Sequence, residues 1–440
     1  MIRFAAALLA FALLASCKGA EPPTRVVVLG FDGAGWETIE PSIRAGKLPF
    51  LERLRNESAW GPLQSFKPTK SPVIWTSIAT GKTMAKHGIL DFVFLEENDI
   101  QVPYSNSERR EPSIWQILDH LGKRSVVVNW FVTYPPDPID GVMVSNRLRK
   151  VLLLGPERRA RMRDSVHPPD RFDQLEPFFD LDYESVREER ELPDLGSRYQ
   201  ELHRKPASEE AVLKDYPVYV LQEALIENIA RHLYGSERFD FFAAYFRLPD
   251  IVQHTALRLL EPERVEETLE ALRKGRVSEE EEARFREELA EVLLPFYRYQ
   301  ERVLEAFLSV PGSENTYFLV VSDHGFSLHA GGYDHYHIPA SEPAPSGIFL
   351  LKGPKVKPGR TAAMSVYDVA PTILHLFDLP SGTDMDGRPA VDLLGIDREA
   401  RYQLYPRELM MISPRDSDDE LDRELDEKTL RELRALGYLP

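Results

Sequence analysis

Short apolar runs, separated by stretches of helical periodicity, limit this chain to few folds. Apolar positions at helical spacing lie at 36–57, 113–121, 211–233 and 364–377. The runs between them have the length and the β-branched and aromatic content of strands buried on both faces of a parallel sheet. They are RVVVLGF (25–31), SVVVNW (125–130), FDFFAAYF (239–246), TYFLVV (316–321) and GIFLL (347–351). Strands that alternate with helices predict a doubly wound α/β sheet flanked by helices.

Other segments depart from that alternation. Residues 151–214 are rich in Pro, Arg and Asp and are predicted to form a mostly helical insertion or cap. This leaves 25–150 and 215–395 to build the α/β domain. Residues 261–310 predict long helices, the second of which opens with a capping box at Ser278–Glu281. In the tail, 396–440, leucines recur among charges, as expected of an amphipathic helix docked on the domain.

Residues 1–17 have the pattern of a secretion signal. Arg3 precedes an apolar run at 4–14, which is shorter than the ~20 residues that a membrane-spanning helix needs. The run leads into Leu-Ala-Ser-Cys17, which resembles the bacterial lipoprotein signal. We therefore expect a lipoprotein of the bacterial cell envelope that faces the periplasm, anchored to the membrane by lipid on Cys17, with a linker at 18–24. The alternative is an ordinary secretory signal with an incidental cysteine.

Composition excludes several classes of function. The chain has 440 residues, one cysteine and a formal net charge of −17. A single cysteine forms neither an internal disulfide nor a Cys-rich metal site. The negative charge argues against nucleic acid as a partner, because phosphate backbones are bound by basic surfaces. It does not exclude a small phosphorylated substrate, because a bound metal ion can reverse the local charge.

Aspartates follow three of the predicted strands. Asp32 follows VLGF, Asp323 follows FLVVS, and Asp250 comes just after FFAAYFRLP. Ligands of open α/β sheets bind at the carboxyl ends of the strands, so these side chains are expected to share one site. A turn or helix-cap role is the alternative for each aspartate taken singly.

Histidines near these aspartates point to a metal site. If the segment after Asp250 is helical, Asp250 and His254 lie on one face, four residues apart. His324 directly follows Asp323, and Gly325 permits the irregular turn that would bring both to one ion. Asp and His ligands suit zinc, with manganese possible.

A hydroxyl at a helix start is the candidate nucleophile. Pro72 is favoured at a first helical position, so Ser71 is expected at the N-cap of a helix that runs to about Gly81. Capping that helix is the alternative role. The exposed N–H groups of a helix start suit an anion, and a metal ion could lower the pKa of the hydroxyl.

With these features together, the chain resembles the type I phosphodiesterase/nucleotide pyrophosphatase family of the alkaline phosphatase superfamily. The likeness spans about 25–389 and leaves out most of 150–214 and the tail. It rests on FDGAGW (31–36), PTKSPVIWTSIATGKTMAKHGI (68–89), YFRLPDIVQH (245–254), VVSDHGF (320–326), SGIFLLKGPKVKPG (346–359), YDVAPTILHLFDLP (367–380) and MDGRP (385–389). It implies an alkaline-phosphatase-like fold and the hydrolysis of small phosphoesters, such as nucleotides or phosphodiesters.

The resemblance also implies two zinc ions and a Ser71 phosphoryl-enzyme. Asp32, Asp323, His324 and Ser71 would hold one zinc. Asp250, His254 and a later histidine would hold the other. His337 is preferred as that later ligand, with His335 as the alternative and His329 as a weaker choice. His87, in the His-Gly-Ile turn, is expected to be structural.

Substrate contacts and competing functions follow from the same comparison. Asn106 lies where relatives place an Asn that donates to phosphoryl oxygens, and a turn role is equally open. Lys70 precedes the nucleophile and could contact phosphate, or could be an exposed loop cation.

Many nucleotide-cleaving relatives have Thr where this chain has Ser71. The sulfatase motif C/S-x-P-x-R is absent, because Val73 and Trp75 occupy its Pro and Arg positions. A transferase on the same scaffold and a non-catalytic envelope binding protein are the alternatives.

Overall fold

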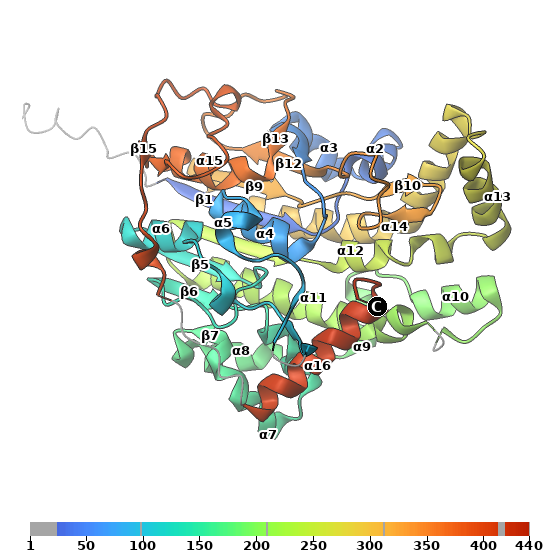
Figure 1. Cartoon of the computed structure of the whole chain (residues 1–440), viewed down its shortest axis with the longest axis horizontal. Coiled ribbons are helices and arrows are strands. Elements are labelled where there is room, and N and C mark those ends of the chain that lie inside the picture. Colours follow the sequence, from blue (N-terminus) through green and yellow to red (C-terminus); the bar gives the residue numbers. More distant parts are fainter. Residues whose placement is uncertain (1–23, 97–98, 208–209, 311–312, 412–418, 440) are drawn as a thin grey trace, which may run out of the picture.

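The computed structural model describes residues 24–439, apart from 97–98, 208–209, 311–312 and 412–418. The signal, Cys17 and most of the 18–24 linker therefore lie outside the described residues. The centre is a nine-stranded sheet of order β13-β2-β12-β9-β1-β8-β5-β6-β7 (Figure 1). In chain order its strands are β1 (Arg25–Phe31), β2 (Ala59–Gln64), β5 (Ser125–Val128), β6 (Gly141–Val144), β7 (Val166–His167), β8 (Phe241–Phe246), β9 (Thr316–Val321), β12 (Gly347–Lys352) and β13 (Met364–Ser365).

Helices cover both faces of this sheet, which confirms the doubly wound α/β prediction. One core layer packs the sheet against α2 (Trp36–Arg44), α3 (Pro49–Asn56), α11 (Ala211–Ser236) and α14 (Glu279–Leu308). The other packs the opposite face against α4 (Ser71–Thr80), α6 (Ile114–His120) and α15 (Val369–Leu376). Neighbouring residues of β1 alternate between the two layers, as strand geometry requires, so the run is apolar throughout.

Strand direction departs from the prediction at one position. The strands β9, β1, β8, β5 and β6 are mutually parallel. The predicted parallel strand at 347–351 is instead antiparallel, because β12 pairs with both β9 and β2 in that sense. The chain between β9 and β12 contains the hairpin β10 (Ser327–His329) and β11 (Gly332–Asp334) rather than a helical crossover. Without a crossover the chain re-enters the sheet in the opposite direction.

Residues 151–214 lie at the far edge of the sheet. They supply the edge strand β7, antiparallel to β6, and short helices that include α9 (Tyr183–Glu189) and α10 (Leu195–His203). Both helices pack on α11. The capping box at Ser278 is confirmed, since its hydroxyl accepts from the Glu281 N–H at the start of α14. The predicted 261–310 stretch forms α13 (Pro262–Arg273) and α14.

The C-terminal helix α16 (Glu420–Ala435) docks on the domain through its apolar face, as predicted. Leu421, Leu425 and Leu433 are buried, and Leu425 is 0% exposed. Lys150 Nζ donates to the Leu425 carbonyl at 2.9 Å, which ties the helix to the loop after β6. Figure 1 shows α16 lying across the domain well away from α15, the preceding helix in the chain.

Truncating Leu425 is expected to loosen this docking. The Leu425→Ala variant should lose about 2–5 kcal/mol of unfolding free energy, because a fully buried leucine leaves a cavity. Leu404 is 66% exposed in the same C-terminal segment, so Leu404→Ala serves as the control and should stay within about 0.5 kcal/mol. Urea unfolding measures both, and equal losses in the two variants would contradict the docked helix.

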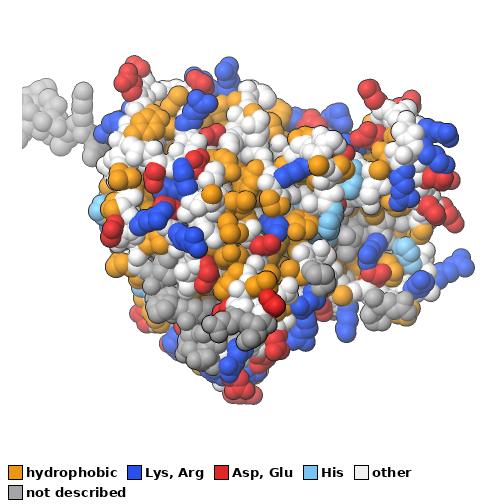
Figure 2. Space-filling view, viewed as in Figure 1, with side chains coloured by type: hydrophobic (Ala, Val, Ile, Leu, Met, Phe, Trp, Pro, Cys, Tyr) orange, Lys and Arg blue, Asp and Glu red, His pale blue; other side chains and the backbone are white. Residues whose placement is uncertain are grey.

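The surface composition and the hydropathy of the helices bear on function. Acidic and basic side chains are interspersed over the face in Figure 2, where hydrophobic side chains gather towards the centre. Within the part of the chain that the structure describes, no helix is both long and apolar enough to span a membrane.

Candidate metal centre and active site

The predicted aspartates meet at the carboxyl edge of the sheet. β1 lies between β8 and β9, so the residues that follow these three strands are neighbours. Asp32 is 2% exposed, Asp250 5% and Asp323 0%. The structure therefore places together the carboxylates that the sequence assigned to one site.

Asp32, Asp323 and His324 form the first group of candidate metal ligands. His324 Nε2 lies 3.3 Å from Asp32 Oδ1 and 3.4 Å from Asp323 Oδ2. Ser71 Oγ lies 3.4 Å from Asp32 Oδ1 and 3.5 Å from His324 Nε2. The hydroxyl thus adjoins the carboxylate and the imidazole with which it was predicted to share an ion.

Ser71 is positioned by α4, which is buried along its whole length. The helix begins at Ser71 with Lys70 as its N-cap, one residue earlier than predicted, so Ser71 lies in the first turn. Trp75 packs directly on β1, where a Cβ at Gly30 would meet its ring at 2.7 Å. Glycine at this position therefore lets α4 approach the strand that leads to Asp32.

Asp250 and His335 form a cluster of candidate ligands with His324, and His254 lies close to both, so we call Asp250, His254 and His335 the second group. Asp250 lies in α12 (Leu248–Gln253), and its Oδ1 is 3.5 Å from His254 Nε2, as the predicted four-residue spacing requires. His335 Nε2 lies 3.6 Å from Asp250 Oδ1 and 3.3 Å from His254 Nε2. His324 Nε2 is 4.0 Å from Asp250 Oδ1, so the two groups are contiguous.

The structure corrects the choice between the two later histidines. His335 follows β11 directly, is 0% exposed, and has its carbonyl held by the Thr69 hydroxyl. The preferred candidate, His337, points to solvent with 64% of its side chain exposed and pairs with Asp334 at 2.8 Å. His329 belongs to neither ligand group, and its Nδ1 accepts from the Gly331 N–H. His335, the alternative, is thus the residue that completes the second group.

His87 is buried away from these groups. Its Nε2 lies 3.0 Å from the Ser77 hydroxyl, and burial together with the Arg109 charge lowers the pKa of His87 to about 3. A buried neutral imidazole hydrogen-bonded within its own helix pair fits the structural role that was expected.

Electrostatics in the centre favour a bound cation. Burial and the charge of Asp32 raise the pKa of Asp323 well above its usual range. The pKa of His324 rises to about 10, because Asp323 and Asp32 outweigh the effect of burial. Burial and the neighbouring His324 and His254 hold the pKa of His335 well below its usual range. A divalent cation would neutralise the crowded carboxylates and take the lone pair of a neutral imidazole.

Buried ligand atoms without partners support the same reading. Oδ1 of Asp250 and Oδ2 of Asp323 have no hydrogen-bond partner within the described residues. Such buried polar atoms are rare unless something else satisfies them. The donor set of carboxylate oxygens and imidazole nitrogens fits zinc or manganese.

Two tyrosines at the centre were missed by the sequence analysis. Tyr245, the penultimate residue of β8, donates to Asp32 Oδ2. The Tyr438 hydroxyl lies 2.8 Å from His254 Nε2, 2.9 Å from His335 Nε2 and 3.1 Å from Asp250 Oδ2. Tyr438 comes from the C-terminal tail, outside the blocks that carry the family likeness. The position of Tyr245 in a strand next to β1 could have indicated its role.

Asn106 and Lys70 are both engaged by other side chains or backbone groups of the chain. The Asn106 amide donates to the Pro135 carbonyl and to Asp137 Oδ1, each at 2.8 Å, and its oxygen accepts from Arg109. With every group engaged and 1% exposure, Asn106 is a structural residue. The Lys70 ammonium pairs with Asp91 and lies 5.4 Å from the centre of the Tyr336 ring.

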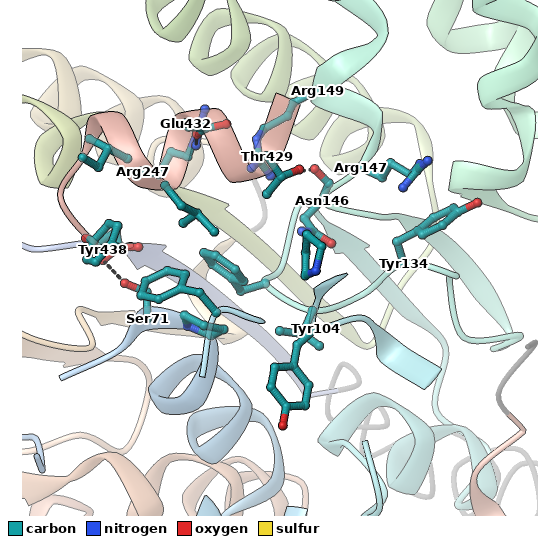
Figure 3. A pocket seen from close by; sticks show the side chains of 18 of the residues that line it. Ser71, Tyr104, Tyr134, Asn146, Arg147, Arg149, Arg247, Thr429, Glu432 and Tyr438 are labelled. Atoms are coloured by element: carbon teal, nitrogen blue, oxygen red, sulfur yellow. Dashed lines mark hydrogen bonds and ion pairs between the residues drawn. The ribbon is translucent and has the colours of Figure 1, made fainter. Parts of the chain in front are cut away.

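A pocket opens from Ser71 along the carboxyl edge of the sheet, and we call it the active-site pocket. Figure 3 shows Ser71 and Tyr438 at one end, Tyr104 and Tyr134 along the pocket, and α16 crossing it. Thr429, Glu432 and Leu433 of α16, and Leu436 directly after it, line the wall. None of the described residues of 151–214, predicted as a cap, lines it. The tail forms the wall instead.

Glu432 links this wall to the pocket floor and predicts a pH dependence. It pairs with Arg247, and the charges of Arg247, Arg149 and Lys150 lower its pKa to about 2 despite burial. A carboxyl with a depressed pKa stabilises the folded state above its unfolded pKa and loses this contribution as pH falls towards its folded pKa. Glu432→Gln should therefore cost about 3 kcal/mol at pH 7, and the gap from wild type should close between pH 4.5 and 2. Urea unfolding across this range checks it, and a gap that is independent of pH would contradict it.

Comparison with models of known protein families shows to which family the chain belongs. The model of the type I phosphodiesterase / nucleotide pyrophosphatase family matches residues 26–337. The chain belongs to this family. It is therefore a hydrolase of phosphoric ester bonds, and the family is metal-dependent, in keeping with the two groups of Asp and His side chains.

Solved structures show the same fold at low identity. A putative sulfatase from Bacteroides thetaiotaomicron VPI-5482 is 11% identical, with 86% of this chain and 76% of that chain covered and a TM-score of 0.50. BT1596, a 2-O GAG sulfatase, is 10% identical over 85% of this chain and 74% of its own, with a TM-score of 0.50. Human ectonucleotide pyrophosphatase/phosphodiesterase 5 is 12% identical over 84% and 100%, with a TM-score of 0.46. The two structures with a TM-score of 0.50 confirm the predicted alkaline-phosphatase-like fold.

Proposed function

We propose that this chain cleaves small phosphodiesters, such as nucleotide esters or pyrophosphates, through a phosphorylated Ser71 and two zinc ions. The observation that carries the proposal is the Ser71 hydroxyl, 3.4 Å from Asp32 Oδ1 and 3.5 Å from His324 Nε2 at the start of a helix. The first ion would be held by Asp32, Asp323, His324 and Ser71, and the second by Asp250, His254 and His335. Manganese is the alternative metal.

The metal ions, when bound, supply positive charge that lowers the pKa of the serine hydroxyl and neutralises the phosphoryl oxygens. Ser71 Oγ loses its proton to the leaving oxygen or to solvent and bonds to phosphorus while the bond from phosphorus to the leaving oxygen breaks. Water then attacks phosphorus, the Ser71 Oγ–P bond breaks, and a proton from that water returns to Ser71 Oγ. Ser71 lies at the positive end of the α4 dipole, which favours negative charge on the phosphoryl oxygens.

A panel of chromogenic esters tests the proposal. The purified chain, loaded with zinc, should hydrolyse bis(nitrophenyl) phosphate faster than nitrophenyl phosphate, and nitrophenyl sulfate hardly at all. Elemental analysis should find two zinc ions per chain. Protein that turns over none of these esters, or that is fully active after exhaustive chelation, would overturn the proposal.

Sulfate-ester cleavage is the competitor that the similar structures raise, since two of them are sulfatases by name. Formylglycine formation needs the C/S-x-P-x-R motif, and here Val73 and Trp75 replace its Pro and Arg. Both side chains are 0% exposed within α4, and Trp75 belongs to the core between this helix and the sheet, so they serve packing. This favours an unmodified serine acting on phosphorus.

The transferase and the non-catalytic alternatives make opposite predictions in the same panel. A transferase would release product slowly until an alcohol acceptor is added, whereas a hydrolase releases inorganic or monoester phosphate in water alone. A binding protein would hold the metals and convert nothing. Product formation without an acceptor therefore decides among the three.

Envelope anchoring remains a separate proposal that rests on the sequence around Cys17. Cells expressing the full chain should incorporate labelled palmitate into it, and the protein should fractionate with membranes. The Cys17→Ser variant should lose the label. Incorporation that persists in this variant would refute a lipid at Cys17.

A further inference from the structure

The active-site pocket has a wall of basic residues that the chemistry at Ser71 does not use. Arg147, Arg149, Lys150 and Arg247, which we call the cationic wall, all line the pocket. Arg147, Arg149 and Lys150 follow β6, and Arg247 follows β8. The wall therefore lies at the same carboxyl edge of the parallel strands as Asp32 and Asp250, in one pocket with Ser71.

These cations are buried, so their charges need partners. Their exposed fractions are 7% for Arg147, 5% for Arg149, 6% for Lys150 and 8% for Arg247. Arg147 is paired with Asp422 and Asp426, and Arg247 with Glu432, all from α16. The docked helix α16 thus supplies the carboxylates that neutralise these two arginines.

Arg149 and Lys150 are not accounted for in this way. Among the described residues neither is in a direct ion pair with a carboxylate, although the charge of Glu432 acts on both without contact. Arg149 Nη1 donates to the Asn146 carbonyl at 2.7 Å, and its buried Nε has no hydrogen-bond partner. Lys150 donates to the Leu425 carbonyl and to the Thr429 hydroxyl, both uncharged. A buried guanidinium with an unsatisfied N–H and no carboxylate in direct contact is costly unless a ligand satisfies that N–H.

The local charge balance points the same way. Burial and the charge of Arg149 lower the pKa of Lys150 to about 7, and burial and Arg247 lower that of Arg149 to about 10. The wall thus holds four basic side chains against three carboxylates of α16, Asp422, Asp426 and Glu432. Figure 3 shows Arg149 directed towards Thr429 and Asn146 beneath α16, at a distance along the pocket from Ser71.

We propose that Arg149 and Lys150, supported by Arg147 and Arg247, form a subsite for a second anionic group of the substrate, remote from the reacting phosphorus. The subsite takes an oxyanion, a phosphate or a carboxylate, because a guanidinium N–H and an ammonium donate well to such oxygens. The inference rests on the proposed function and narrows its substrates to phosphodiesters that carry an additional negative charge.

Three nitrophenyl phosphodiesters with the same reacting centre test the subsite on the full chain. Their second ester group is ethyl, 2-carboxyethyl or 2-phosphonooxyethyl. The wild type should prefer at least one charged ester over the ethyl ester by about 10–100-fold in kcat/KM, as expected for charge-assisted hydrogen bonds. The better of the two charged esters tells whether the anion is a phosphate or a carboxylate.

Variants separate recognition from docking of α16. Arg149→Met should reduce the preference ratio about tenfold or more, and Arg149→Lys should restore part of it. Arg158→Met is the matched control, because Arg158 pairs with Glu424 of α16 but does not line the pocket. Its ratio should equal that of the wild type. Equal turnover of all three esters by the wild type, or a preference that survives Arg149→Met, would overturn the subsite.

Failure of the hydrolysis itself would leave the subsite testable. If none of the esters is cleaved, the proposed function fails. Calorimetry of inorganic phosphate with chelator-treated protein then measures the wall alone, since the uncompensated carboxylates of Asp32, Asp250 and Asp323 disfavour an anion at the metal centre. Binding that weakens about tenfold in Arg149→Met would support the subsite, and equal binding by both proteins would refute it.

Discussion

The Ser71→Ala variant is expected to lose at least about a thousandfold in kcat, while it keeps its fold and most of its metal. Removing the hydroxyl removes the only atom that can form the proposed bond to phosphorus. The carboxylates and imidazoles of both ligand groups remain, so the metal ions would stay bound. Ester hydrolysis and elemental analysis of the same preparation measure both effects.

A neighbouring serine supplies the control for this loss. Ser77 is also buried in α4, and its hydroxyl contacts His87 at 3.0 Å rather than either ligand group. Ser77→Ala should change stability by about 1 kcal/mol and kcat by less than threefold. Ser71→Thr keeps a hydroxyl, so this variant should still form the covalent intermediate and hydrolyse the esters at a measurable rate. If Ser71→Ala hydrolysed the esters at the wild-type rate, a nucleophile at Ser71 would be refuted.

Most of the sheet could be predicted because burial on both faces leaves a direct trace in the sequence. The run at 25–31 is apolar in the sequence because its side chains enter both core layers. The direction of β12 could not be predicted, because the run GIFLL would be equally apolar in a parallel or an antiparallel strand. Only the segment that connects β9 to β12 determines the strand direction. β2 was missed because its Gly and Pro, and its exposed Pro62 and Gln64, hide the strand pattern.

The aspartates of the site could be predicted for a topological reason. Asp32 follows β1 directly and Asp323 follows β9 after one residue, while Asp250 lies in the first turn of α12, just after β8. The fold alone therefore brings them together. The two roles left open for Asn106 could not be separated from sequence, because the acceptors of its amide N–H groups are distant in the chain. In the structure it completes a network around Asp137, which also accepts from Arg109 and Trp115.

Long-range contacts account for what the sequence could not reveal. Tyr438 reaches His254, 184 positions earlier, only because α16 folds back across the pocket. The charge pairs that seat this helix, such as Arg147 with Asp422, join residues 275 positions apart. Neither leaves a periodic pattern. Such contacts explain why the tail, predicted only as an amphipathic helix docked on the domain, forms a wall of the active-site pocket.

The two histidines of the segment 335–337 provide the most discriminating test of the second metal site. His335→Ala should lose one of the two metal ions per chain and at least about a hundredfold in kcat/KM. The reason is geometric, since His335 Nε2 lies 3.6 Å from Asp250 Oδ1 and 3.3 Å from His254 Nε2. Elemental analysis and ester hydrolysis of the same preparation measure the two losses.

His337→Ala is the matched control, because it removes the same side chain two residues away. That side chain is 64% exposed and pairs with Asp334 outside both ligand groups, so metal content should be unchanged and kcat/KM should stay within about twofold. His254→Ala should reproduce the His335→Ala result, since both nitrogens face the same Asp250 oxygen. If His337→Ala lost the metal and His335→Ala kept it, His337 rather than His335 would be the metal ligand. Such a result would overturn the second ligand group while leaving Asp32, Asp323 and His324 intact as the first.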